Sequence, residues 1–206
     1  MKIKNYIVLA LVFFIVLTCT TNPFTGKKTM AFVSNNQLFP QSFAQYNQVM
    51  GESDIIKGTK DSEMITRVGQ RIAVASERWL NANGYQGYLK DYQWQYSLIE
   101  SDQVNAWCMP GGKIAFYTGI LPVAANETGI AAIMGHEVAH ALANHGQQRM
   151  SAAYLQQGLG VIGNVALASN QQALGIFNQS YGIASNVAGI LPFSRAHVLP
   201  LKQIAQ

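Results

Sequence analysis

The sequence predicts an α+β domain in which helices pack beside a small antiparallel sheet. An amphipathic helical pattern at residues 61–80 precedes three short strand-like runs, and a second helical pattern follows Pro122. Strands and helices therefore occupy separate stretches of the chain, which favours a sheet edge beside the second helix. The net charge of +4 is scattered, without a basic stripe interleaved with aromatic residues, so we expect no nucleic-acid partner.

Residues 1–19 have the features of an export signal. Lys2 and Lys4 precede an apolar run at residues 6–17 that is too short to span a bilayer comfortably. The next residues, Val16-Leu17-Thr18-Cys19, are similar to a bacterial lipobox, whose cysteine carries the lipid. We therefore expect a lipoprotein anchored in a membrane through Cys19 and facing the periplasm; an ordinary secretory signal cleaved nearby is the alternative.

Residues 20–60 are expected to form a tether and an N-terminal segment, followed by the main domain at residues 61–206. Helix-like spacing of apolar residues predicts one docking helix in the N-terminal segment (Phe39, Phe43, Tyr46, Val49 and Met50). The helix predicted at 61–80 has Asp61 or Ser62 as its expected N-cap.

Three strands are predicted between residues 93 and 118. Residues 93–100 alternate apolar and polar side chains, and residues 104–109 lead through the tight turn Pro110-Gly111-Gly112 into residues 113–118. With Cys19 lipidated, Cys108 has no partner for a disulfide, and we interpret it as a buried small apolar residue.

The second helix contains the pattern His136-Glu137-Val138-Ala139-His140. Residues four apart lie on one face of a helix, so both imidazoles are able to point at one metal ion, with Glu137 beside them to handle a water proton. Asn126 is the expected N-cap of this helix, and Gly146 is its expected stop. Two ordinary histidines, solvated or in the core, are the alternative interpretation.

The chain beyond Gly146 is rich in Ala, Gly, Gln, Ser and Asn. It is not apolar enough for a transmembrane helix, because Asn and Gln interrupt its apolar runs. We expect two amphipathic, loosely packed helices that cover the histidines.

Taken together, these motifs resemble the membrane-linked zinc endopeptidases of the HtpX and CAAX-prenyl-protease type, which are gluzincins. The bacterial lipoprotein branch, related to the mitochondrial inner-membrane stress protease, is the most similar. The matching pieces follow in the family's order and spacing: Asn105-Ala106-Trp107, Pro110-Gly111-Gly112, Thr118-Gly119-Ile120-Leu121, and the helix that ends Asn144-His145-Gly146.

The resemblance implies a metalloendopeptidase with one Zn²⁺ per chain. His136 and His140 would be zinc ligands and Glu137 the general base. Asn105 and Ala106 would lie on an edge strand that holds a polypeptide substrate, such as a misfolded or unassembled cell-envelope protein, in extended form. A turn or strand-end amide is the alternative role for Asn105.

The chain departs from the family after Arg195, where a helix carrying Glu-x-Glu-Ala-Asp should supply the third zinc ligand. No Asp or Glu follows Glu137. One possible set of codons for residues 201–205, read in a shifted frame, spells Glu-Ala-Asp-Arg, so we hypothesise a frameshift after about His197 that leaves the domain incomplete. We favour a site that lacks its third ligand over a substitute from elsewhere. Of the two possible substitutes, His197 is the better, because His145 lies about 140° round a continuous helix from His140. The competing function is a catalytically defective, peptide-binding lipoprotein.

Overall fold

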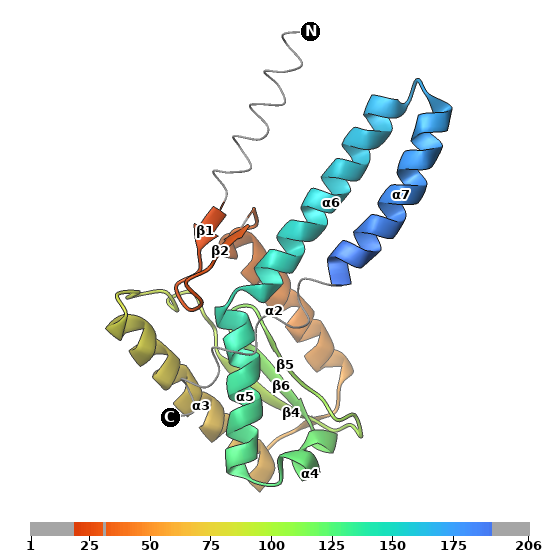
Figure 1. Cartoon of the computed structure of the whole chain (residues 1–206). Helices are drawn as coiled ribbons and strands as arrows, with labels where there is room; N and C mark the ends of the chain where they lie inside the picture. The colour runs from red at the N-terminus through yellow and green to blue at the C-terminus, as the bar shows by residue number, and fades with distance from the viewer. Residues whose placement is uncertain (1–18, 31, 191–206) are drawn as a thin grey trace.

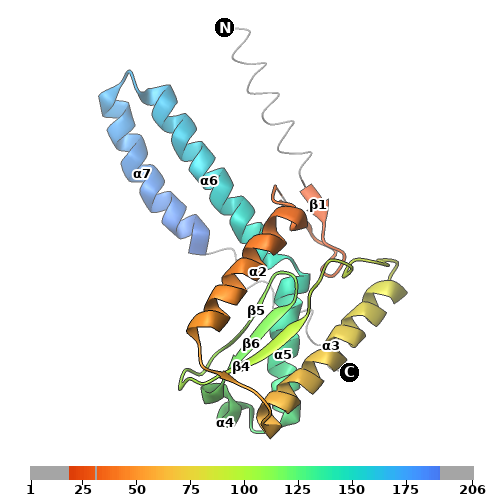
Figure 2. The ribbon, with the colours of Figure 1, turned by 180° about the vertical axis from the view of Figure 1, so that it is seen from behind.

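The computed structural model describes residues 19–30 and 32–190. Residues 1–18 of the predicted export signal (1–19) and the chain from residue 191 onward, which contains His197, lie outside the described residues. A four-stranded sheet lies between helices (Figures 1 and 2): α3 (Lys60–Ala82) and α5 (Glu127–Leu142) cover one face, and α2 (Asn35–Glu52) crosses the other. The predicted α+β class is therefore confirmed.

The sheet has the strand order β3-β4-β6-β5 and is mixed rather than purely antiparallel. Its strands are β3 (Ile55–Ile56), β4 (Gln95–Ile99), β5 (Ala106–Met109) and β6 (Lys113–Tyr117). β3 pairs with β4 and β5 pairs with β6 in antiparallel fashion, whereas β4 and β6 are parallel. The chain reverses once before β5 and again after it, so β6 runs in the direction of β4 and β5 becomes the outer strand.

The core lies between the sheet and the two helices α3 and α5. Its buried side chains come from these elements and from the short helices that connect β6 to α5, which are η1 (Thr118–Ile120) and α4 (Leu121–Ala124). The most deeply buried large side chains of this cluster are Ile65, Leu80, Leu98, Ile114, Phe116, Ile130, Met134 and Leu142. Most of the apolar row of the second predicted helix is thus buried, which ties its position to the sheet.

Helix α3 begins earlier than the sequence suggested. Its N-cap is Thr59, whose side chain accepts a hydrogen bond from the Ser62 backbone N–H, so the expected cap at Asp61 or Ser62 is wrong. Thr59 and Ser62 bond to each other reciprocally, an arrangement that satisfies two N–H groups at once. Further along, Gly69 lets the helix approach β4, because a Cβ there would lie 2.2 Å from Cε1 of Tyr96.

The N-terminal segment packs on the domain. β1 (Cys19–Thr21) and β2 (Lys28–Met30) form an antiparallel hairpin, and Asn22 lies at its turn with 2% of its surface exposed. The Asn22 side chain accepts hydrogen bonds from the backbone N–H groups of Phe24 and Thr25 and donates one to the Leu142 carbonyl. Leu142 is the last residue of α5, so this hairpin is fastened to the end of the helix that carries the histidines.

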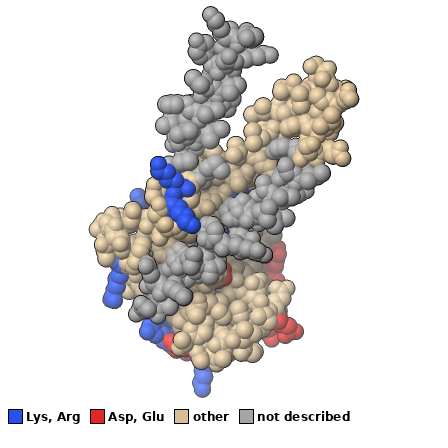
Figure 3. Space-filling model, in the orientation of Figure 1, with Lys and Arg blue, Asp and Glu red and all other residues tan. Residues whose placement is uncertain are grey.

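A helical hairpin projects from the domain beyond α5 (Figure 1). It consists of α6 (His145–Leu167) and α7 (Gln171–Ile190), and it extends away from the sheet rather than across the histidines, where cover was expected. Residues 150–190 contain no Lys, Arg, Asp or Glu, so beyond Arg149 the hairpin is uncharged, and its outer part is uniformly tan in Figure 3. Within the described residues, none of the helices is both long and apolar enough to cross a bilayer. Exposed apolar side chains nevertheless occur along it: Tyr154, Leu159, Val161, Ile162, Val165 and Ile176.

Candidate active site

Helix α5 begins as the sequence predicted. The Asn126 side chain accepts a hydrogen bond from the Gly129 backbone N–H, which confirms the predicted cap, and Glu127 places an acidic group in the first turn. Gly129 is required by packing, because a Cβ there would lie 1.9 Å from the Ala124 carbonyl oxygen. The start of the helix is therefore fixed both by its cap and by the close approach of α4.

The end of α5 differs from the prediction. The helix ends at Leu142, and Asn144 adopts a left-handed backbone conformation with φ 57°, so the chain turns before α6 begins at His145. Asparagine is the residue most tolerant of this conformation after glycine, because its short polar side chain bonds locally. The Asn144 side chain donates a hydrogen bond to the Tyr88 hydroxyl at 3.0 Å, which holds the turn.

Gly146 therefore has a different role from the expected helix stop. It lies in the first turn of α6, where a Cβ would be 2.8 Å from Cγ of Pro110. Pro110 belongs to the turn between β5 and β6. The glycine lets the start of α6 pack against the sheet instead of terminating α5.

The two histidines of the helical motif lie on one side of α5, as their spacing predicted. The Nε2 atoms of His136 and His140 are 3.0 Å apart, and the two rings meet edge to face at an interplanar angle of 86°. Two ligands of a tetrahedral zinc ion would lie about 3.3 Å apart, given metal–nitrogen distances of about 2.0–2.1 Å. The pair thus has the spacing of two ligands of a single ion.

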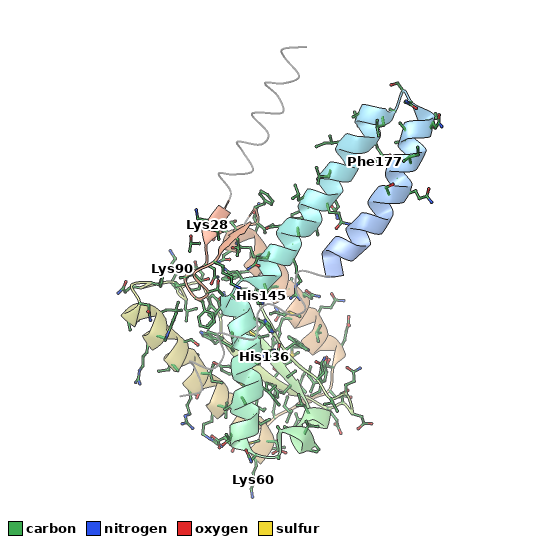
Figure 4. The ribbon with its side chains drawn as sticks, viewed as in Figure 1. Lys28, Lys60, Lys90, His136, His145 and Phe177 are labelled. Atoms are coloured by element: carbon green, nitrogen blue, oxygen red, sulfur yellow. The ribbon has the colours of Figure 1, made fainter. Side chains whose placement is uncertain are left out.

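His145 is brought against the outer edge of the His140 ring. Its Nδ1 lies 2.7 Å from Nδ1 of His140, and only 8% of the His145 surface is exposed. Figure 4 shows His136 partway along α5 and His145 at the junction of α5 and α6. The expectation that the helix of His140 continues as far as His145 is wrong, because the left-handed Asn144 breaks it and turns His145 back toward His140.

From the sequence, His145 was expected only as a substitute metal ligand. In this arrangement it contacts Nδ1 of His140, whereas the face shared with His136 is formed by Nε2, on the other side of the ring. His145 therefore lies on the side of the His140 ring that faces away from His136. The available signal was Asn144, whose tolerance of the left-handed conformation marks a helix end one residue before His145.

Glu137 lies beside the histidine pair in a partly buried position. Burial raises the pKa of its carboxyl group, and the nearby His136 opposes that rise. A carboxyl group held near the core is a better proton acceptor than one in free solution, because its pKa moves toward neutrality.

Cys108 lies close to this carboxylate on β5. Its thiol pKa is raised by burial and, to a lesser extent, by the negative charge of Glu137, and the residue forms no disulfide. Its side chain packs against the main core cluster, in keeping with the predicted apolar role. A thiol that stays protonated is a weak nucleophile and a poor metal ligand.

Of the two predicted substrate residues, Ala106 lies on the outer strand β5, whereas Asn105 lies just before the strand begins. Ala106 begins β5 and pairs with Phe116 of β6, and the exposed Asn105 precedes it, with its carbonyl accepting from the Tyr117 N–H. Among the described strands, β5 pairs with β6 alone, so its other edge is open. α5 packs against β5, which places this edge on the strand nearest the histidine helix.

The described part of the chain contains no group of three or more His, Cys, Asp or Glu side chains arranged to hold a metal ion. His136 and His140 supply two nitrogen donors of the kind that zinc prefers, with Glu137 adjacent. The donor set therefore fits two positions of a zinc site. A third protein ligand would have to come from outside the described residues.

Comparison with known proteins gives a consistent result. Residues 62–199 match peptidase family M48. The mitochondrial metalloendopeptidase OMA1 of Schizosaccharomyces pombe is 33% identical over 107 residues, covering 52% of this chain and 30% of the relative. The beta-barrel assembly-enhancing protease of Yersinia pestis is 23% identical over 181 residues, covering 85% of this chain and 34% of the relative. The chain thus spans about a third of the length of these curated relatives.

Proposed function

The chain belongs to peptidase family M48, a family of metallopeptidases, and from this premise we propose that it is a zinc-dependent metalloendopeptidase. One observation carries the proposal: the Nε2 atoms of His136 and His140 face each other at 3.0 Å, with Glu137 next to them in the same helix. A histidine pair at this spacing beside a carboxylate is the arrangement that zinc peptidases use.

In this proposal His136 and His140 hold the metal. A bound zinc ion would act as a Lewis acid toward the peptide carbonyl and would make water more acidic. The third ligand is proposed to come from the chain beyond residue 190, where His197 is the available histidine. His145 is not proposed as that ligand, because it contacts the opposite edge of the His140 ring.

Glu137 is proposed to be the general base. Its carboxylate accepts the proton of the attacking water and later delivers it to the amine of the departing segment, so the same group acts as base and then as acid. Burial raises the pKa of this carboxyl group, which increases its affinity for the proton it must take up.

The substrate is proposed to be an extended polypeptide that adds to the open edge of β5 at Asn105 and Ala106. Added strands bind through main-chain hydrogen bonds, so recognition depends little on the substrate's side chains. This suits misfolded or unassembled cell-envelope proteins, which expose extended segments. The packing of α5 against β5 supports this placement, because it brings such a segment next to the histidine helix.

We further propose that the protein is anchored to a membrane through a lipid on Cys19 and faces the periplasm. The support is the lipobox-like sequence before Cys19. Radiolabelled palmitate should be incorporated by the wild type and by a Cys108→Ala variant, but not by Cys19→Ala. Equal labelling of Cys19→Ala would contradict the anchor without touching the peptidase proposal.

The peptidase proposal is tested on purified full-length protein by metal analysis and casein cleavage. We expect about one zinc per chain, and cleavage abolished by Glu137→Gln with zinc retained, because this substitution removes the base and keeps both ring donors. The matched control is Glu127→Gln, which removes a carboxylate from the first turn of the same helix and should cleave casein like the wild type. Equal activity of Glu137→Gln and wild type would refute the assigned base.

The alternative is a catalytically defective family member that binds peptides at the β5 edge. The observation that favours it is that no group of three metal-binding side chains occurs among the described residues. Protein without zinc that still binds unfolded casein would support this alternative. Stoichiometric zinc together with cleavage would exclude it.

A further inference from the structure

His145 is a buried histidine that the peptidase chemistry proposed above does not use. It occupies the first position of α6 and is 8% exposed, with its Nδ1 2.7 Å from Nδ1 of His140. His140 is therefore contacted at both ring nitrogens: by His136 at Nε2 and by His145 at Nδ1. The three rings form a row in which His140 is the middle member.

The position of His145 depends on the break between α5 and α6. On a continuous helix a residue five places on would lie about 140° round the axis and could not reach His140. Three features fix the break: the left-handed Asn144, its side-chain hydrogen bond to the Tyr88 hydroxyl at 3.0 Å, and the close packing of Gly146 on Pro110. These contacts involve separate parts of the chain, so the orientation of His145 is held by the fold rather than by a single turn.

The contact has a specific consequence for a metal-binding imidazole. A histidine that binds metal through Nε2 must carry its own proton on Nδ1, and a group accepting that proton fixes both the tautomer and the orientation of the ring. His145 is at hydrogen-bond distance from this nitrogen. When Nδ1–H of His140 donates to Nδ1 of His145, the Nε2 lone pair of His140 is left facing His136.

We infer that His145 is a positioning residue for His140, holding it in the tautomer and orientation that bind zinc. The inference rests on the proposed function, because it takes His140 to be a ligand. It assigns His145 an indirect role, behind the ligand, in place of the direct contact with the ion considered from the sequence. Carboxylates or backbone carbonyls usually fill this role, so a neutral histidine would orient the ring without adding negative charge.

The inference is tested on the full chain by zinc affinity, measured by competition with a chelating dye. His145→Ala should bind zinc about 10- to 100-fold more weakly, the range typical for loss of such a supporting group. His145→Gln, whose amide oxygen is able to accept the Nδ1 proton, should recover part of the loss. The control is Gln147→Ala: Gln147 is equally buried on the same turn of α6 and bonds to Val33 rather than to a histidine, so its affinity should match the wild type.

A second measurement reports on the ring itself without metal. ¹⁵N NMR of the imidazoles in metal-free protein should show His140 protonated at Nδ1 in the wild type and in Gln147→Ala, and a mixture of tautomers in His145→Ala. Unchanged zinc affinity in His145→Ala would overturn the inference, as would an unchanged His140 tautomer. A wild type that binds no zinc would instead refute the proposed function, and the tautomer measurement would still decide whether His145 sets the His140 ring.

Discussion

Replacing Asn22 by alanine should weaken the domain through the end of the histidine helix. Asn22 is almost completely buried and makes three side-chain hydrogen bonds: it accepts from the N–H groups of Phe24 and Thr25 at 3.0 and 2.9 Å and donates to the Leu142 carbonyl at 2.9 Å. Each such bond contributes about 0.5–1.5 kcal/mol net, and buried groups left without a partner cost more. In the variant the Leu142 carbonyl would still accept a hydrogen bond from the Tyr88 hydroxyl, which partly offsets the loss of the bond from Asn22.

The expected decrease in the free energy of unfolding for Asn22→Ala is therefore about 2–4 kcal/mol, a large part of the roughly 5–15 kcal/mol of a typical domain. Equilibrium urea denaturation measures this decrease. The slope of the unfolding free energy against urea concentration should stay unchanged, because the surface exposed on unfolding is the same. Asn36→Ala is the control: Asn36 is an exposed asparagine in α2, where alanine is at least as favourable.

A decrease below about 0.5 kcal/mol would refute this reasoning. It would mean that the β1–β2 hairpin detaches before the domain unfolds, so that its hydrogen bonds do not contribute to the cooperative transition. Limited proteolysis would then cut the wild type between residues 22 and 30 under native conditions.

Two further predictions concern the contact between α3 and β4. Gly69→Ala should destabilise the domain by about 1–3 kcal/mol, because the new methyl group would overlap the Tyr96 ring. The control is Gly51→Ala, on an open face of α2, which should be neutral or slightly stabilising. Thermal unfolding compares the two variants, and equal melting temperatures would contradict the close packing of α3 on β4. Burial raises the pKa of Tyr96 from 10.0 to about 12, so the folded protein holds this proton after the unfolded chain has lost it. Stability should therefore fall as the pH rises from 10 to 12 and be unaffected by this group below that window. Tyr96→Phe should show a shallower alkaline loss in denaturation curves, and an unchanged slope would exclude this tyrosine as a cause.

Several features were predictable because short-range geometry sets them. His136 and His140 share a face since a helix places residues four apart on one side, and the Asn126 cap follows from its position before an apolar helical row. The turn at residues 110–112 similarly determines that β5 and β6 pair in antiparallel fashion.

Other features required contacts between distant parts of the chain. The parallel pairing of β4 with β6 depends on where β5 docks, and the burial of Asn22 depends on the end of α5, 120 residues away. Neither leaves a local pattern in the sequence, because each is decided by which surfaces meet.

The row of three histidines likewise has one part that was predictable from the sequence and one part that was not. The sequence alone determined that His136, Glu137 and His140 lie together, because residues four apart in a helix are neighbours and Glu137 directly follows His136. Only the tertiary structure decided that His145 contacts His140, since this required the helix to break at Asn144 and the new helix to pack against Pro110 and the sheet. Helical periodicity determines which residues are neighbours within one helix, whereas the packing of separate elements decides where that helix ends.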